Sequence, residues 1–224
     1  MSDTRLTIEI DGTDVTAGAA VSLPVLARRT AAASLTGLEW AVGVPGSVGG
    51  AVRMNAGGHG SDVSRSLRWA RVVALGGDDL DGQLDARRLA LGYRCSSLGP
   101  THVVTAACFG LAPGDRAASE AEIGEIVRWR REHQPGGSNA GSVFANPPDD
   151  AAGRLVEAAG LKGHRRGSAY VSPKHANFIQ VDPGGSADDV AALIAEVRRL
   201  VAQRTGVDLR LELHLIGFST LEEG

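Results

Sequence analysis

The first residues of the chain alternate between apolar and polar side chains, which is the pattern of a half-buried β-strand. The apolar positions are Leu6, Ile8 and Ile10, followed after a gap by Val15 and Ala17. Asp11-Gly12 lies in that gap and is a dipeptide that favours a tight turn, so we expect a β-hairpin. Residues 24–33 repeat apolar side chains at helical spacing instead, and Pro24 suits the first turn of a helix.

Several later stretches carry the same kinds of pattern. Residues 69–75 and 102–108 combine β-branched and apolar side chains and are predicted as strands, as is the stretch 177–182. A helix is expected over 151–159, where Gly160 would end it. These elements mix helices and strands along the whole chain.

The strongest helical pattern covers residues 186–203, and Ser186 and Asp189 suit its N-terminal cap. Its apolar face consists of Val190, Leu193, Ile194, Val197, Leu200 and Val201. The chain alternates again over 209–216, with leucine at every second position from 209 to 215. This alternation predicts a last strand with one apolar and one polar face.

A break at Pro113-Gly114-Asp115 divides these elements into two groups. After the break, Ser119 followed by Glu122 has the spacing of a capping box and predicts that a helix begins there. We therefore expect an α+β protein with one unit over residues 1–112, a second over 113–203, and a closing strand and tail over 204–224.

Composition narrows the functional classes. The formal net charge is −3 and aromatic residues are 4% of the chain, so no nucleic-acid partner is expected. The 43% share of hydrophobic residues fits a folded globule, without an apolar run as long as a membrane span and without a secretory signal. Cys95 and Cys108 fit no disulfide framework, and no histidine pair has metal-site spacing. We expect a cytoplasmic protein that contacts neither membrane nor metal.

Glycine is concentrated in the segment 37–60. Thirty residues of the 224 are glycine, nearly twice the usual share of about 7%. The segment matches neither the dinucleotide fingerprint nor the phosphate-binding P-loop, and its glycine content predicts an irregular loop. Such a loop either lets backbone N–H groups approach a ligand or forms a tight structural crossing, and the sequence alone leaves both readings open.

Four other positions in the sequence carry side chains that are able to act in catalysis or in ligand binding. Ser142 lies in a small-residue turn, where it displays a hydroxyl or caps the next element. Arg94 follows Tyr93, and Glu212 lies on the polar side of the predicted last strand. His175 is a single histidine, a residue type that is more often structural than catalytic. Taken one by one, these residues are explained as well by surface charge and local hydrogen bonding as by a role in catalysis.

Seven segments together, in this order, resemble the UDP-N-acetylenolpyruvoylglucosamine reductase family, whose members are also called UDP-N-acetylmuramate dehydrogenases. The segments are residues 37–51, 54–57, 93–96, 141–147, 159–163, 174–179 and 211–217. The resemblance covers nearly the whole chain. It implies the fold of that family, with an FAD-binding subdomain followed by an α+β substrate-binding C-terminal domain.

The resemblance also implies a flavoenzyme of peptidoglycan synthesis, in which NADPH reduces FAD and an enolpyruvyl ether of a UDP-sugar becomes a lactyl ether. The small-molecule substrate would meet three catalytic residues, Arg94, Ser142 and Glu212. Cofactor contacts are implied for Gly43, Pro45, Gly46, Ser47, Gly49, Gly50, Asn55 and Gly57. Substrate contacts are implied for Tyr93, Asn146 and His175.

The chain departs from the family pattern in three ways. Members usually begin with a further small subdomain against the FAD pyrophosphate, so we expect weaker FAD binding here, or a separate polypeptide that supplies the subdomain. Ala145 and His214 stand where basic residues are common, which we expect to weaken binding of an anionic substrate. Two alternatives stay open: a non-catalytic relic that binds a UDP-sugar without flavin, and another FAD-dependent oxidase with a different substrate.

Overall fold

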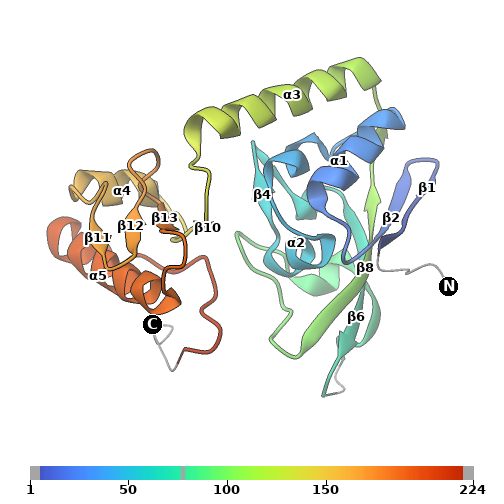
Figure 1. Ribbon diagram of the computed structural model, residues 1–224. Coiled ribbons are helices and arrows are strands. Elements are labelled where there is room, and N and C mark those ends of the chain that lie inside the picture. The colour runs from blue at the N-terminus through green and yellow to red at the C-terminus, as the bar shows by residue number, and fades with distance from the viewer. Residues whose placement is uncertain (1–5, 77–78, 219–224) are drawn as a thin grey trace. The chain divides into compact units, whose positions relative to one another are not determined.

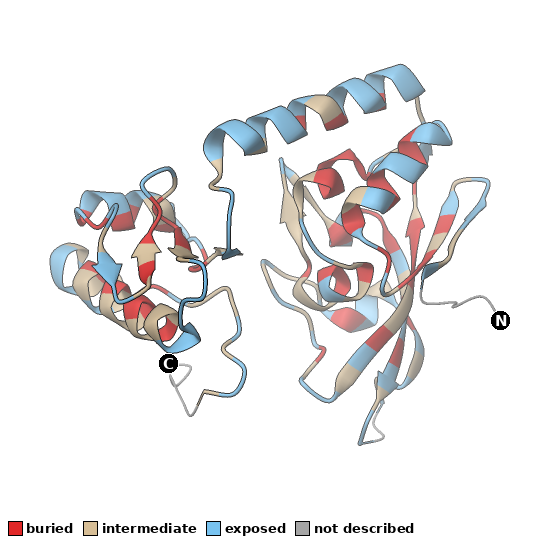
Figure 2. Cartoon of the chain, in the orientation of Figure 1, coloured by how far each residue is buried: buried red, intermediate tan, exposed pale blue. Residues whose placement is uncertain are grey.

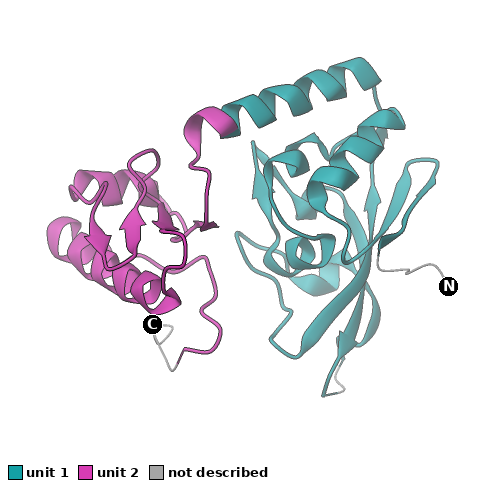
Figure 3. Ribbon diagram, viewed as in Figure 1, with its two compact units in different colours: residues 1–130 teal, residues 131–224 magenta. Residues whose placement is uncertain are grey.

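The computed structural model describes residues 6–76 and 79–218 (Figure 1). The chain divides into two compact units, residues 1–130 and 131–224 (Figure 3). Each unit has its own hydrophobic core, and each combines helices with an antiparallel sheet. The expected α+β class is therefore confirmed.

The first unit is built on a five-stranded antiparallel sheet with the strand order β1-β2-β8-β6-β7. Its strands are β1 Ile8–Asp11, β2 Asp14–Gly18, β6 Leu67–Ala74, β7 Gly82–Asp85 and β8 His102–Gly110. The predicted N-terminal hairpin is confirmed, because Ile10 pairs with Val15 and Gly12 has the positive φ of its turn. Both strands predicted near residues 70 and 105 are also present.

Short helices and ribbons surround this sheet. The α-helices of this part are α1 Leu23–Ala32 and α2 Val48–Met54; the 3-10 turns are η2 Glu39–Gly43, η3 Val63–Arg65 and η4 Ala86–Leu89; and the two-residue strands are β3 Leu35–Thr36, β4 Gly57–Gly58, β5 Ser61–Asp62 and β9 Ala112–Pro113. Helix α2 packs on β2 and β8. The prediction that the glycine-rich segment holds no regular element is wrong, because Ser47 caps α2 by accepting a hydrogen bond from the Gly50 N–H.

Helix α3, Arg116–His133, begins before the predicted capping box. Asp115 caps it instead, since its carboxylate accepts a hydrogen bond from the Ala118 N–H at 2.7 Å. Ile123 and Ile126 of α3 are buried in the core of the first unit. The structure therefore divides the chain at residue 130 and not at the predicted break near 113, because most of α3 packs with what precedes it.

The second unit holds a four-stranded antiparallel sheet with the order β10-β13-β12-β11. Its elements are β10 Asn139–Ser142, α4 Ala152–Ala158, β11 Arg165–Arg166, β12 Ala169–Val171, β13 Phe178–Val181 and α5 Ala187–Thr205. The predicted strand 177–182 and both predicted helices are confirmed. Apolar residues of both helices belong to the core of this unit, and the buried residues are coloured red in Figure 2.

The caps and the C-terminal strand differ from expectation. Ser186 caps α5, but Asp189 accepts hydrogen bonds from Ser168 of the neighbouring turn instead. The predicted strand 209–216 is wrong, since only Leu211 forms a bridge, to Phe144. Its leucines pack on the core of the second unit as predicted, but its backbone finds no continuous partner strand there.

Candidate functional site

The glycine-rich segment of the first unit uses much of its backbone internally. The Val48 N–H donates to the Val21 carbonyl and the Gly49 N–H to the Ala19 carbonyl, both at 2.9 Å. The Gly50 N–H binds the Ser47 hydroxyl at 3.3 Å. The first two bonds tie the start of α2 to the segment that follows β2, and the third caps the helix. This part of the segment therefore forms a tight structural crossing, one of the two readings that the sequence left open.

The exposed part of this segment fits the approach of a flat or charged cofactor group. Pro45 and Gly46 are exposed, and nothing lies within 4 Å of the position that a Cβ on Gly46 would occupy. In the turn just before, the buried indole nitrogen of Trp40 has no hydrogen-bond partner among the described residues. A glycine backbone that faces open space leaves room for a ligand to approach closely.

Asn55, which ends α2, is not arranged like a cofactor ligand. It adopts a left-handed conformation, with φ of 42°, and is only 3% exposed. Its side-chain amide donates to the Gly92 carbonyl at 2.9 Å and accepts from the Ser64 N–H at 2.9 Å. Gly57 is also committed internally, because a Cβ there would lie 2.5 Å from the Ser61 carbonyl oxygen.

Arg94 lies in a tight turn beside these residues. The turn is closed by hydrogen bonds between Gly92 and Cys95, and Arg94 itself has a φ of 55°. Its guanidinium donates to the Gly57 carbonyl at 3.0 Å and lies 5.1 Å from the ring centre of Tyr93. The Tyr93 ring is about half exposed, so the pair presents an aromatic and a cationic group at the surface of the first unit.

A buried carboxylate fixes helix α3 to the same glycine-rich segment. Glu39 accepts a hydrogen bond from the Ser119 hydroxyl at 2.6 Å and one from the Gly37 N–H at 2.8 Å. Burial would raise the pKa of Glu39, but these hydrogen bonds outweigh burial and hold the pKa below its ordinary value. Edge-to-face contact between His59 and Trp129 is a second link from the segment to α3.

Ser142 ends strand β10 of the second unit, directly before a segment clamped by Asn177. The Phe144 N–H donates to the Asn177 side-chain oxygen at 3.0 Å, and the Asn177 amide donates to the Phe144 carbonyl at 2.8 Å. The Val143 N–H donates to the Asn177 carbonyl at 2.9 Å. The sequence analysis placed Asn177 only as the first residue of the predicted strand 177–182, and no local signal indicated that its side chain binds Phe144.

Glu212 lies beside this clamped segment. Its N–H donates to the Val143 carbonyl at 2.9 Å, next to the bridge between Leu211 and Phe144. The structure therefore places Glu212 beside Val143, the residue that follows Ser142, within the second unit. Arg94 belongs to the first unit.

The two other predicted substrate residues of the second unit have structural partners. The Asn146 side-chain oxygen accepts from the Ala152 N–H at 3.0 Å, at the start of α4. His175 Nδ1 accepts from the Asn177 N–H at 3.2 Å, and its ring meets Phe178 edge to face. Burial lowers the pKa of His175, so its ring is held neutral with the proton on Nε2.

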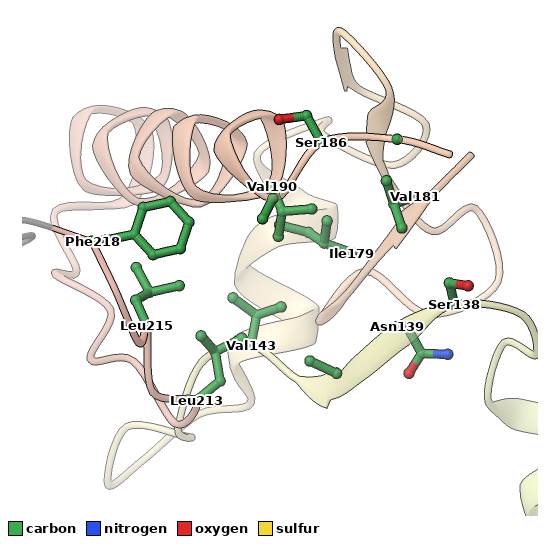
Figure 4. A pocket seen from close by; sticks show the side chains of 13 residues that line it. Ser138, Asn139, Val143, Ile179, Val181, Ser186, Val190, Leu213, Leu215 and Phe218 are labelled. Atoms are coloured by element: carbon green, nitrogen blue, oxygen red, sulfur yellow. The ribbon is translucent and has the colours of Figure 1, made fainter. Parts of the chain in front are cut away.

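A separate apolar pocket of about 340 Å³ lies in the second unit (Figure 4). Ile179 and Val181 of β13, Val190 of α5, and the C-terminal Leu213 and Leu215 line much of it. None of the predicted catalytic or substrate residues is among its lining residues. This pocket is therefore not the site that the sequence motifs predict.

The described residues contain no cluster of three or more histidine, cysteine or acidic side chains able to hold a metal ion. None of their helices is both long enough and apolar enough to cross a membrane.

Comparisons with known proteins agree with the family resemblance that the sequence motifs indicate. A model of the UDP-N-acetylenolpyruvoylglucosamine reductase C-terminal domain matches residues 133–216, and a model of an FAD binding domain matches residues 2–82. A UDP-N-acetylenolpyruvoylglucosamine reductase 2 of Symbiobacterium thermophilum is 43% identical over 94% of this chain and 68% of its own length. The chain belongs to the UDP-N-acetylenolpyruvoylglucosamine reductase family.

Other relatives of this family support the assignment in sequence and in structure. The reductase of Rubrobacter xylanophilus is 41% identical over 94% of this chain and 70% of its own length. The crystal structure of the Thermus caldophilus reductase superimposes with a TM-score of 0.80 at 34% identity, covering 94% of this chain and 74% of that one. The chain thus spans about 70% of the length of these reductases.

Proposed function

We propose that this chain catalyses the FAD-dependent, NADPH-consuming reduction of the enolpyruvyl ether of UDP-N-acetylglucosamine to UDP-N-acetylmuramate, a step of peptidoglycan synthesis. The observation that carries the proposal is family membership over nearly the whole chain, with an FAD-binding match followed by the reductase C-terminal match. The reaction adds one hydride and one proton across the carbon–carbon double bond. Bound FAD would carry the hydride equivalent from NADPH.

The exposed residues Pro45 and Gly46, with the half-buried Ser47, are the part of the glycine-rich segment that we assign to FAD. Gly46 leaves open space there, whereas the N–H groups of Val48, Gly49 and Gly50 are already bonded. Gly43, Gly49, Asn55 and Gly57 then serve the shape of the segment, while Pro45, Gly46 and Ser47 approach the cofactor.

Arg94 is assigned to the substrate carboxylate. When hydride adds to the terminal carbon of the enol ether, negative charge spreads over the neighbouring carbon and the carboxylate. A guanidinium matches a carboxylate with two parallel hydrogen bonds and stabilises that charge. Glu212 is assigned to the same end of the substrate as a polar contact.

Ser142 is assigned the proton that completes the reduction. The hydroxyl is a weak acid, so it protonates carbon only where the accepting carbon is strongly basic and water is excluded. Asn177 supports this role, because its side chain fixes the backbone immediately after Ser142. Ser142 and Glu212 lie on paired segments, which fits two groups that serve the same substrate.

Two broader assignments follow from this function. We propose that the enzyme supports cell-wall growth, and through it cell shape and division. We propose a cytoplasmic location, for which the free thiols Cys95 and Cys108 are the support in this chain.

A steady-state assay tests the proposed function. The purified chain with added FAD is expected to oxidise NADPH only when the enolpyruvyl ether is present, and to form UDP-N-acetylmuramate in equal amount. Binding of the UDP-sugar without any NADPH oxidation, at saturating FAD, would instead show a non-catalytic relic.

A further inference from the structure

The Asn55 side chain is fully used inside the first unit. Its amide nitrogen donates to the Gly92 carbonyl at 2.9 Å and reaches the Asp62 carboxylate at 3.4 Å. Its oxygen accepts from the Ser64 N–H at 2.9 Å. Two donors and one acceptor are thereby occupied in a side chain that is 3% exposed. The residue links the end of α2 to two segments distant in sequence.

One of those segments is the turn that carries Arg94. The Gly92 carbonyl that accepts from Asn55 also accepts from the Cys95 N–H, at 3.2 Å, and so closes the turn around Arg94. The Arg94 guanidinium then donates to the carbonyl of Gly57, two residues beyond Asn55. Backbone and side chain of Arg94 are both held by the stretch 55–57.

The conformation of Arg94 makes such support necessary. Its φ of 55° is a left-handed conformation that a non-glycine residue rarely adopts without external contacts. Asn55 has a φ of 42°, a conformation that asparagine tolerates better than most residues. Two left-handed residues joined through the Gly92 carbonyl thus set the direction of one guanidinium.

We propose that Asn55 is a positioning residue for Arg94, acting through the hydrogen bond to the Gly92 carbonyl, and not a ligand of the cofactor. The proposal rests on the function assigned to Arg94 above. A guanidinium displaced by about 1 Å pairs poorly with the developing charge, so the loss of Asn55 is expected to lower turnover on the order of 10-fold to 100-fold. Reduction of the flavin by NADPH does not use Arg94 and is expected to stay unchanged.

Two variants of Asn55 test whether its hydrogen bond to the Gly92 carbonyl, and not its left-handed backbone conformation, positions Arg94. Asn55→Gly keeps the left-handed backbone but removes every side-chain contact. Asn55→Asp keeps the backbone and an acceptor for the Ser64 N–H while removing the donor to Gly92. Because it places a second carboxylate beside Asp62, it is made together with Asp62→Asn, and this pair serves if the glycine variant fails to fold. Ser64→Ala is the matched control, because it removes a hydrogen bond to Asp62 in the same region without touching the turn.

A double-mutant cycle with Arg94→Lys tests the connection. Asn55→Gly is expected to lower kcat in the parent enzyme, and to cost less than about threefold when Arg94 is already lysine. Ser64→Ala is expected to leave turnover unchanged in both backgrounds. Equal losses from Asn55→Gly in both backgrounds, or slower flavin reduction by NADPH, would overturn the proposal.

Hydrogen exchange gives a second readout that does not depend on catalysis. In the chain without ligands, Asn55→Gly is expected to accelerate amide exchange across residues 92–98, while Ser64→Ala leaves that exchange unchanged. Unchanged exchange in the glycine variant would refute the positioning role even if the parent protein did not turn over the enolpyruvyl ether. Absence of turnover in the parent protein, with accelerated exchange in the variant, would count against the proposed function alone.

Discussion

Replacement of Asn177 by alanine should destabilise the second unit strongly. Its side chain is the partner of both backbone groups of Phe144, with distances of 3.0 Å and 2.8 Å, and Phe144 is 1% exposed. Alanine would leave a buried N–H and a buried carbonyl without a partner. Each orphaned group costs about 1 to 3 kcal/mol, so the free energy of unfolding should fall by about 2 to 6 kcal/mol.

Urea unfolding followed by far-UV circular dichroism measures this loss. With a denaturant slope of about 2 kcal/mol per molar urea, the midpoint should fall by about 1 to 3 M. Trp40, Trp69 and Trp129 all belong to the first unit, so tryptophan fluorescence reports on that unit and serves as an internal reference.

Asn139→Ala is the matched control for this experiment. Asn139 also bonds to nearby backbone, but it is exposed, so water replaces the lost partners. Its replacement should change the free energy of unfolding by less than about 0.5 kcal/mol. If Asn177→Ala cost no more than Asn139→Ala, the clamp on the segment after Ser142 would not exist as described.

Three further predictions concern other parts of the chain. Ser142→Ala should leave flavin reduction by NADPH intact but slow turnover of the enolpyruvyl ether by on the order of 10² to 10⁴, as rapid mixing would show; equal slowing of both steps would make Ser142 structural. Because burial lowers the pKa of His175, the unfolded chain binds more protons and stability is lost as pH falls below about 6.5; urea unfolding of His175→Asn should show less of this loss than the parent. Gly57→Ala should lower the free energy of unfolding by about 1 to 3 kcal/mol in the same assay, because its Cβ would clash with the Ser61 carbonyl. Gly46→Ala faces open space, so it should leave the free energy of unfolding unchanged but weaken FAD binding, as a titration with FAD would show.

The helices and strands that were predicted correctly are those whose sequence pattern involves residues close to one another in the chain. Helix α5 follows from a cap at Ser186 and an apolar face repeated along its length. The first hairpin follows from alternation around Asp11-Gly12. In both cases the residues that decide the structure are close neighbours in the chain, so pattern and structure agree.

The elements predicted wrongly depend on partners elsewhere in the chain. Helix α2 forms despite its glycines because Gly49 lets it lie against Ala19, at 3.0 Å from the position of a Cβ, and because Ser47 caps it. The alternation over 209–216 does place leucines on a core, but a strand also needs a neighbouring strand, and only Phe144 provides a bridge. Alternation of apolar and polar residues therefore indicates which side chains are buried, but it does not show whether the backbone pairs with another strand.

In the candidate site, too, some residues could be named from the sequence and others could not. Arg94, Ser142 and Glu212 were named through the family resemblance, and their roles stay predictions. The residues that hold them were not predicted as supports: Asn55 lies 37 residues from its partner Gly92, and Asn177 lies 33 residues from Phe144. No local pattern reports hydrogen bonds over such separations.

A single-turnover experiment tests the central claim, that this one chain passes electrons from NADPH through FAD to an enolpyruvyl ether. The FAD-loaded chain is reduced anaerobically with one equivalent of NADPH and then mixed with the enolpyruvyl ether of UDP-N-acetylglucosamine. The account predicts that the absorbance of oxidised flavin returns without oxygen and that one equivalent of UDP-N-acetylmuramate forms. Flavin that NADPH reduces but that the ether leaves reduced would contradict it.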